Sequence, residues 1–314
     1  DAEQHFDARE GMKVASQGGY CRALPQDKLK HFIDQLAEAT RAMGFKNEKD
    51  HPEVAPGQFE LTYKHRNALH AADQILLYQL TARQIAANMG ATASFLPKPI
   101  AGINGNGMHS NISLEKEGRN MFFDAEGPDQ LSEKARMFIA GVLSHGKNLC
   151  LPLNSSVNAY RRLDPNFEAP NAIKVHASDR SSMIRIPLGN EKSARMEVRS
   201  MAPDTNPYLA YTLILRAGLE GVLSEGDKKA ELLQMLDDKA RVVETLPANI
   251  QDAIARFQDS EFVERVMGPG NKAKFQALKQ AVADRSPKEL GKTIKKWEVL
   301  DHHAVRNQDL SKDF

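Results

Sequence analysis

Within its first sixty residues the chain reads Glu53-Val-Ala-Pro-Gly-Gln-Phe-Glu60, which places two carboxylates on either side of a Pro-Gly turn. From Gln58 to Tyr63 apolar and polar residues alternate, and this alternation predicts a strand leaving the turn. If the turn folds the two sections against each other, both carboxylates reach one hard cation. Taken in isolation, the segment is more typical of two surface glutamates.

Two further segments add an imidazole and closely spaced guanidiniums. The first is Asn104-Gly-Asn-Gly-Met-His109, whose glycines let the backbone approach a ligand closely. The second is Arg195-Met-Glu-Val-Arg199, a predicted strand with Arg195, Glu197 and Arg199 on one face. Alone, the first is a common loop with a structural histidine and the second an exposed salt-bridge ladder. Together with the two glutamates they are the groups that hold Mg²⁺ or Mn²⁺ against phosphate.

The cations of the chain's middle part gather in a short stretch. Within 38 residues lie Arg162, Arg180, Arg185, Lys192, Arg195 and Arg199, besides Lys174. Scattered surface charges also produce such a run, but fixed guanidiniums beside a metal site are what phosphoryl transfer requires. The sequence has no G-x-x-x-x-G-K-[ST] phosphate loop, so ATP would need another binding architecture.

Composition narrows the class of protein. Lys and Arg number 42 against 41 Asp and Glu, a net charge of +1, which gives no sign of a general nucleic-acid or membrane surface. The two cysteines, Cys21 and Cys150, are too few for a disulfide framework, and we expect a cytoplasmic protein. No stretch reaches the roughly 20 apolar residues of a membrane span. The first residue is not Met, which suggests a processed chain or part of a longer one.

The order of predicted elements indicates an α+β fold. Helices are predicted at residues 25–43, 67–89, 131–149 and 207–221, the second with an apolar stripe that includes Leu69, Leu76 and Leu80. Strands are predicted at 58–63, on both sides of the glycine loop within 92–114, and within 171–200. A polar loop is expected from 150 to 170. Residues after about 224 read as helices only, so mixed structure is followed by a helical C-terminal third.

An ordered set of segments resembles one enzyme family. It runs nearly continuously from about residue 18 to residue 223 and comprises Gly18-Gly-Tyr20, Glu53-Val-Ala-Pro-Gly-Gln58 with Glu60, Phe95-Leu-Pro-Lys-Pro-Ile100, Asn104 to His109, Asn158-Ala-Tyr-Arg-Arg-Leu163, Phe167-Glu-Ala-Pro170, Asp179 to Pro187, Arg195 to Arg199 and Asn206-Pro-Tyr-Leu209. In these residues the chain is similar to the catalytic domain of type I glutamine synthetases, the ATP-dependent glutamate–ammonia ligases. The resemblance implies a curved antiparallel sheet edged by helices.

The resemblance also implies a role for each matching residue. Glu53 and Glu60 would bind one divalent metal, Mg²⁺ or Mn²⁺, and His109 with Glu197 a second. Substrate glutamate would meet Asn104, Gly105, Arg162 and Arg199, the last of which would then hold the acyl phosphate. ATP would be surrounded by Glu48, Asn111, Ser113, Arg180, Arg185 and Lys192. The catalytic set would be Glu168, Arg180 and Arg199, with Glu168 on a closing loop taking a proton from ammonium.

The implied reaction converts glutamate into γ-glutamyl phosphate with ATP, after which ammonia displaces phosphate to give glutamine. The implied assembly is a homo-oligomer, a dodecamer of two stacked hexameric rings with active sites shared between subunits. Residues 1–314 would form one catalytic domain, with an active-site core at 1–223 and a helical part at 224–314. The family's N-terminal β-grasp domain is absent from the sequence, so we expect little activity from this chain alone.

Departures from the family pattern leave alternatives open. His51-Pro52 replaces the paired histidines usual before Glu53, and Asp179 replaces the usual Asn before Arg180. Relatives on the same fold ligate glutamate to polyamines or methylamine, and their metal and phosphate residues look the same. A non-catalytic relative that keeps only the fold is a further alternative.

Overall fold

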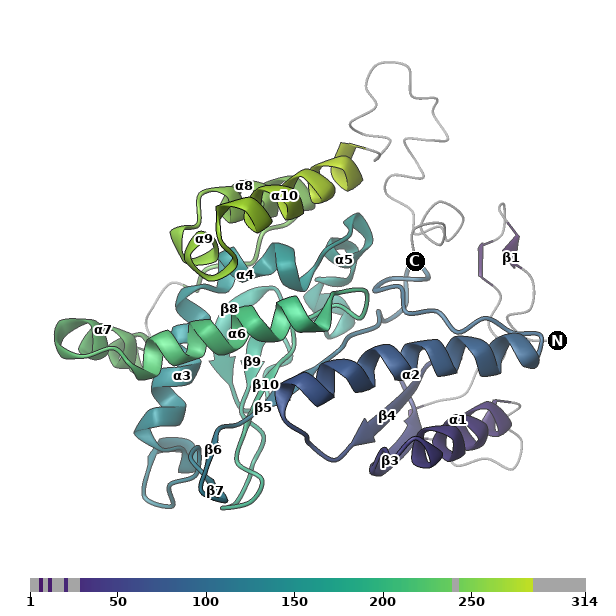
Figure 1. The fold of residues 1–314 in the computed structure, drawn as a ribbon, viewed down its shortest axis with the longest axis horizontal. Helices are drawn as coiled ribbons and strands as arrows, with labels where there is room; N and C mark the ends of the chain where they lie inside the picture. Colours follow the sequence, from purple (N-terminus) through teal and green to yellow (C-terminus); the bar gives the residue numbers. More distant parts are fainter. Residues whose placement is uncertain (1–5, 8–10, 13–19, 22–28, 239–242, 285–314) are drawn as a thin grey trace. The chain divides into compact units, whose positions relative to one another are not determined.

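The computed structural model describes residues 6–7, 11–12, 20–21, 29–238 and 243–284 (Figure 1). These residues fall into two compact units, the first ending at Asn106 and the second beginning at Gly107. Within the described residues, no helix is both long enough and apolar enough to span a bilayer. Each unit carries its own set of chemically active side chains.

The first unit is built on a hairpin flanked by two helices. Strands β3 (Asn47–Pro52) and β4 (Phe59–Tyr63) pair antiparallel, as the alternation around Gln58 predicted for the second of them. Helix α1 (Lys30–Ala42) buries Ile33 and Leu36, and Gly44 ends it with a φ of 86°, a conformation that glycine adopts without strain. The predicted start of this helix at Pro25 lies outside the described residues. A short antiparallel pair, β1 (Phe6–Asp7) and β2 (Gly11–Met12), precedes it.

Helix α2 (Ala68–Asn88) confirms the predicted long helix, and the Asn67 side chain caps it by accepting the N–H of His70. The predicted apolar stripe, which also includes Ala72, is buried only in part. Leu69 and Leu80 are more than 60% exposed, whereas the small side chains of Ala72, Ala82 and Ala86 are buried. The helix is apolar on more than one side, so its sequence period alone does not identify the face that packs. A row of edge-to-face ring contacts, Phe45–Tyr63–Tyr78–Phe95, joins α2 to β4.

The second unit contains a four-stranded sheet in the order β5-β10-β9-β8. Its strands are β5 (Ser110–Ile112), β8 (Ala172–His176), β9 (Ser182–Arg185) and β10 (Met196–Val198). Strand β10 pairs antiparallel with both β5 and β9, but β8 and β9 are parallel, so the expected fully antiparallel sheet is mixed. The connection after β8 runs back beside it, because the Ser181 carbonyl accepts the N–H groups of both Asn171 and Ala172. The α+β class is confirmed.

Helices surround this sheet. They are α3 (Glu133–Ser144), α4 (Gly146–Leu153), α5 (Val157–Arg162), α6 (Pro207–Val222), α7 (Gly226–Asp237), α8 (Ile250–Gln258), α9 (Glu261–Met267) and α10 (Pro269–Asp284). Asn206 caps α6 as predicted, by accepting the N–H of Leu209. A small hairpin, β6 (Glu115–Lys116) with β7 (Arg119–Asn120), and two 3-10 turns, Pro128–Gln130 and Pro165–Phe167, complete the unit.

Three predictions of local structure are wrong. The single helix at 131–149 is two helices, since the backbone leaves helical geometry at His145. The strand before the glycine loop is irregular chain in which Pro97 and Pro99 lack N–H donors, and the Pro97 carbonyl instead accepts the N–H of Asn106. The expected loop at 150–170 contains α5, whose start is capped by Ser156.

Close contact between α3 and α6 depends on glycine. A Cβ on Gly221 would lie 2.1 Å from the carbonyl oxygen of Met137, and one on Gly141 would lie 2.4 Å from that of Ala217. These distances are too short for any side chain, so the helix backbones approach as closely as glycine permits. The contact belongs to the core that also holds Phe138 and the sheet residue Met196.

We expect Gly221→Ala to destabilise the protein by about 1–3 kcal/mol, because the added methyl overpacks a contact with rigid backbone. Thermal unfolding measures the effect as a lowered midpoint. The matched control is Gly270→Ala in α10, where a Cβ meets nothing within 4 Å and should be neutral or slightly stabilising. Equal midpoints for the two variants would contradict the packing argument.

Candidate functional site

Strand register brings three polar residues into one row on the sheet of the second unit. Glu197, at the centre of β10, is the direct partner of Asn111 on β5 and of Arg185 on β9. Side chains of directly paired residues project from the same face of a sheet. The row therefore follows from the order β5-β10-β9 and from the placement of Glu197 in the middle strand.

The Glu197 carboxylate is buried, with only 4% of its side chain exposed, and cations surround it. Its Oε1 accepts a hydrogen bond from Nη1 of Arg199 at 2.9 Å and lies 3.3 Å from Nδ1 of His109. Its Oε2 accepts Nε of Arg185 at 2.8 Å, and Nη2 of the same guanidinium also donates to it. The solvent-exposed ladder that the isolated pattern suggested is thus wrong for Glu197 and Arg199. Arg195 instead donates to Oδ1 of Asn111.

Charge sets the protonation of this cluster. Burial raises the pKa of Glu197, but His109 and the charges of Arg185 and Arg199 outweigh it and bring that pKa down to about 2. Loss of hydration lowers the pKa of His109, and Arg162 and Arg199 lower it further, while its hydrogen bond to Glu197 opposes them. The cluster therefore contains an ionised carboxylate beside an imidazole that favours the neutral, ligating form.

The glycine loop before β5 makes room for Arg162. A Cβ on Gly107 would lie 2.5 Å from Nη2 of Arg162 and 2.8 Å from Nε2 of His109. Arg162 ends α5, is buried, and donates through Nη2 to the carbonyl oxygen of Arg199 at 2.8 Å. Burial, and then the charge of Arg199, lower the pKa of Arg162 to about 10, while Asp204 acts against them. A side chain at position 107 would therefore displace the ends of the Arg162 and His109 side chains from this arrangement.

Glu168 lies in an exposed segment directly after a 3-10 turn. It follows the 3-10 turn Pro165–Phe167 with a φ of 61°, and its side chain is 44% exposed. Its carboxylate pairs with Arg180, and its carbonyl oxygen accepts Nη2 of Arg199 at 3.3 Å. The backbone carbonyl of Glu168, and not its carboxylate, is thereby linked through Arg199 to the buried Glu197.

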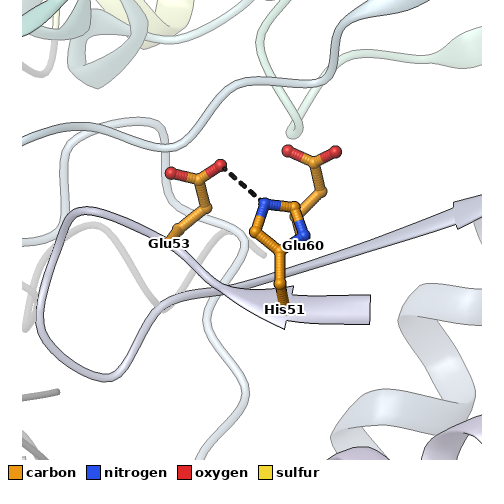
Figure 2. A group of neighbouring side chains, drawn as sticks. All are labelled: His51, Glu53 and Glu60. Carbon is orange, nitrogen blue, oxygen red and sulfur yellow. Dashed lines mark ion pairs between the residues drawn. The ribbon is translucent and has the colours of Figure 1, made fainter. Parts of the chain in front are cut away.

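The first unit contains a separate acidic group on its hairpin (Figure 2). His51 on β3 is the direct partner of Glu60 on β4, and Glu53 follows His51 by two residues. One ligand atom from each of the three lies within 4.8 Å of the others. Desolvation raises the pKa of Glu60, a hydrogen bond and the charge of Glu53 raise it further, and His51 and Lys49 oppose them. Two carboxylates competing for one space are a place where a cation would be stabilising.

The remaining predicted residues are divided between the units. Glu48 is exposed on β3, and Asn104 and Gly105 lie in the first unit, where the Gly105 carbonyl accepts Nε2 of Gln58 at 3.1 Å. Ser113 and Lys192 are exposed in the second unit. The structure thus brings His109, Glu197, Arg162, Arg185 and Arg199 together, pairs Glu168 with Arg180, and places Glu53 beside Glu60. His51 was missed, although it stands two residues before Glu53, the spacing that puts both on one face of a strand.

Comparison with known proteins places this geometry in a family. Residues 1–301 match the family described as glutamine synthetase, catalytic domain. The chain belongs to that family. The glutamine synthetase of Methanosarcina mazei is 39% identical over 262 residues, which cover 82% of this chain and 59% of that protein. For that of Thermus thermophilus the identity is 37% over 289 residues, covering 90% and 64%.

A solved structure of Plasmodium falciparum glutamine synthetase has the same fold, with a TM-score of 0.79 over 92% of this chain and 64% of that chain. The two sequences are 22% identical, so this likeness concerns the fold alone. The chain spans between 59% and 64% of the length of the two curated relatives described above.

The donor chemistry fits the two divalent metals that membership of the glutamine synthetase family implies. Glu53 and Glu60 offer carboxylate oxygens on one hairpin, and His109, just before β5, and Glu197, on β10, offer an imidazole and a carboxylate. These are ligands that suit Mg²⁺ or Mn²⁺. In the second set, Arg185 and Arg199 neutralise Glu197 in the absence of an ion.

Asp204 gives the second unit a predictable pH dependence. Its Oδ2 accepts Oγ of Ser156 at 2.5 Å, and burial, opposed by Ser156, Lys279 and Arg162, raises its pKa from 3.8 to about 6. The folded state then holds a proton that the unfolded chain has lost. The contribution of Asp204 to stability therefore falls by up to about 3 kcal/mol as pH rises from 4 to above 6, and that contribution is then constant.

We expect Asp204→Asn to remove this dependence, because an amide does not ionise. Unfolding free energies at pH 4.5, 5.5, 6.5 and 7.5 should show the difference between variant and parent growing with pH. The exposed Asp259→Asn is the control and should give a difference that is constant with pH. A constant difference for Asp204→Asn as well would refute the assignment.

Proposed function

We propose that the full-length protein is a glutamate–ammonia ligase, which uses ATP to convert L-glutamate and ammonia into L-glutamine, ADP and phosphate through γ-glutamyl phosphate. The observation that carries the proposal is the buried Glu197, held between His109, Arg185 and Arg199 and connected through Arg199 to the exposed Glu168. A metal-ligating pair among fixed guanidiniums serves phosphoryl transfer to a carboxylate. Family membership supports the same chemistry.

In the proposed mechanism, carboxylates and an imidazole bind the metal ions, and most of the residues around phosphate are positively charged. Glu53 with Glu60 holds one divalent ion, and His109 with Glu197 holds the other, both Mg²⁺ or Mn²⁺. When bound, these ions neutralise phosphate oxygens. Arg199 holds the γ-carboxylate of glutamate and then the acyl phosphate. The residues assigned to ATP are Glu48, Asn111, Ser113, Arg180, Arg185 and Lys192.

Other residues are proposed to bind the remaining two substrates, glutamate and ammonium. Asn104 and Gly105 meet substrate glutamate, and the buried guanidinium of Arg162 binds its α-carboxylate. Glu168 leaves Arg180, approaches ammonium and takes its proton, so that neutral ammonia attacks the acyl phosphate. Its loop also keeps water from hydrolysing that intermediate. The active protein is a cytoplasmic homo-oligomer, a dodecamer of two stacked hexameric rings with active sites shared between subunits, and residues 1–314 form one catalytic domain.

The deciding experiment is phosphate release by the full-length parent protein with glutamate, ATP and Mg²⁺, comparing ammonium, methylamine and a polyamine as acceptors. Ammonium should give the highest kcat/KM. Preference for an amine would assign the protein to the γ-glutamyl-amide ligases, which would use the same metal and phosphate residues. Activity with none of the three acceptors would contradict the proposal and favour a non-catalytic relative.

We expect Glu168→Gln to lower kcat with ammonium by about 10²-fold or more, because an amide cannot accept the proton. The affinity for glutamate should change little, since Glu168 is assigned to the ammonium step. The matched control is Glu117→Gln, an exposed glutamate that also has a positive φ of 54°. Loss of activity in both variants, or in neither, would contradict the role given to Glu168.

A further inference from the structure

We propose that His51 is a third ligand of the divalent ion at Glu53 and Glu60, so that one hairpin supplies an imidazole and two carboxylates. The inference rests on the proposed function, because it extends one of the two metal pairs by a residue that neither the resemblance nor the comparisons assign. It also predicts a preference, since an added imidazole nitrogen shifts a carboxylate site from Mg²⁺ toward Mn²⁺ and later first-row metals.

The backbone of the hairpin fixes the three side chains on one side (Figure 2). His51 and Glu60 are cross-strand partners, and Glu53 follows His51 at the two-residue period of a strand. The turn is closed by Glu53 N–H donating to the Gln58 carbonyl at 2.8 Å. Because the Val54 N–H binds Oε2 of Glu53 at 2.9 Å, Oε1 of that carboxylate is left to face His51.

The surroundings of the His51 ring are a second, independent observation that indicates a metal-binding residue. Its side chain is only 10% exposed, and neither ring nitrogen has a hydrogen-bond partner among the residues that the structure describes. Its Nε2 lies 3.5 Å from Oε1 of Glu53, too far for a well-formed hydrogen bond. Tyr20 covers the ring edge-on, with centroids 5.5 Å apart. A buried imidazole without partners costs stability, and an ion bound to Nε2 would remove that cost.

Spacing permits an ion among the three groups. Their ligand atoms lie within 4.8 Å of one another, whereas neighbouring ligands of an octahedral ion with bonds of about 2.1 Å are about 3 Å apart. Binding of an ion would therefore require the two glutamate side chains to rotate toward His51. A plain His51–Glu53 ion pair would instead shorten the 3.5 Å contact to hydrogen-bond length and leave Glu60 outside it.

Pulsed EPR of Mn²⁺ in the full-length protein tests the proposal, because a coordinated imidazole nitrogen modulates the echo. The second proposed ion has its own histidine, so all variants are made in a His109→Gln background. In that background we expect the nitrogen modulation to persist, and to shift when histidine is labelled with ¹⁵N. This readout needs no His51 variant and therefore does not depend on whether one folds.

Adding His51→Gln should abolish the modulation and weaken Mn²⁺ binding by at least about 10-fold, with a smaller loss for Mg²⁺. The matched control is His65→Gln, an exposed histidine in the same unit, which should change neither signal nor affinity. Mn²⁺ binding that Glu53→Gln weakens but that shows no nitrogen modulation would overturn the role of His51 while preserving the metal pair. Binding unaffected by Glu53→Gln would remove the hairpin site and, with it, part of the proposed function.

Discussion

The second unit depends on how one buried carboxylate is neutralised. Glu197 lies at the centre of a four-stranded sheet, where an unpaired ionised carboxylate would be strongly destabilising. Arg185 and Arg199 supply the compensating charge, and His109 contacts the same carboxylate. These groups come from different segments of the chain. Neutralising Glu197 therefore requires the observed register of β5, β10 and β9, and it also fixes the start of the Glu168 loop through Arg199.

The hydrogen bonds that stabilise Glu197 compete with the metal binding that we propose for the same carboxylate. The guanidinium of Arg185 occupies Oε2 of Glu197, an oxygen that a metal ion would also use. A cation that arrives there replaces an existing partner instead of filling a gap. Under the proposed function, Arg185 would then be available to bind an anion such as phosphate. The surrounding guanidiniums thus favour the ionised form of Glu197, and their hydrogen bonds to that carboxylate orient them.

Residues and their spacing predicted the α+β class and most helices, because caps such as Asn206 and stops such as Gly44 act locally. The pairing of Glu53 with Glu60 was also predictable, since a Pro-Gly turn between alternating residues has few ways to fold. Burial was not predictable. Glu197 and Arg199 match an exposed ladder until the neighbouring strands are known, and α2 is apolar on more than one side, so its packed face depends on partners distant in sequence.

The net charge of +1 for the whole chain conceals two clusters of opposite character. On the hairpin, Glu53 and Glu60 lie beside His51, whose ring nitrogens have no hydrogen-bond partner among the described residues, and a divalent cation would offset the charge of the two carboxylates. Around Glu197, three buried or half-buried arginines outnumber one carboxylate, so the group keeps a positive excess suited to carboxylate or phosphate oxygens. The net charge hides these clusters because their charges cancel in the sum, whereas the strand register shows which charged side chains lie together. A divalent cation therefore suits the hairpin cluster, whereas carboxylate or phosphate oxygens suit the cluster around Glu197.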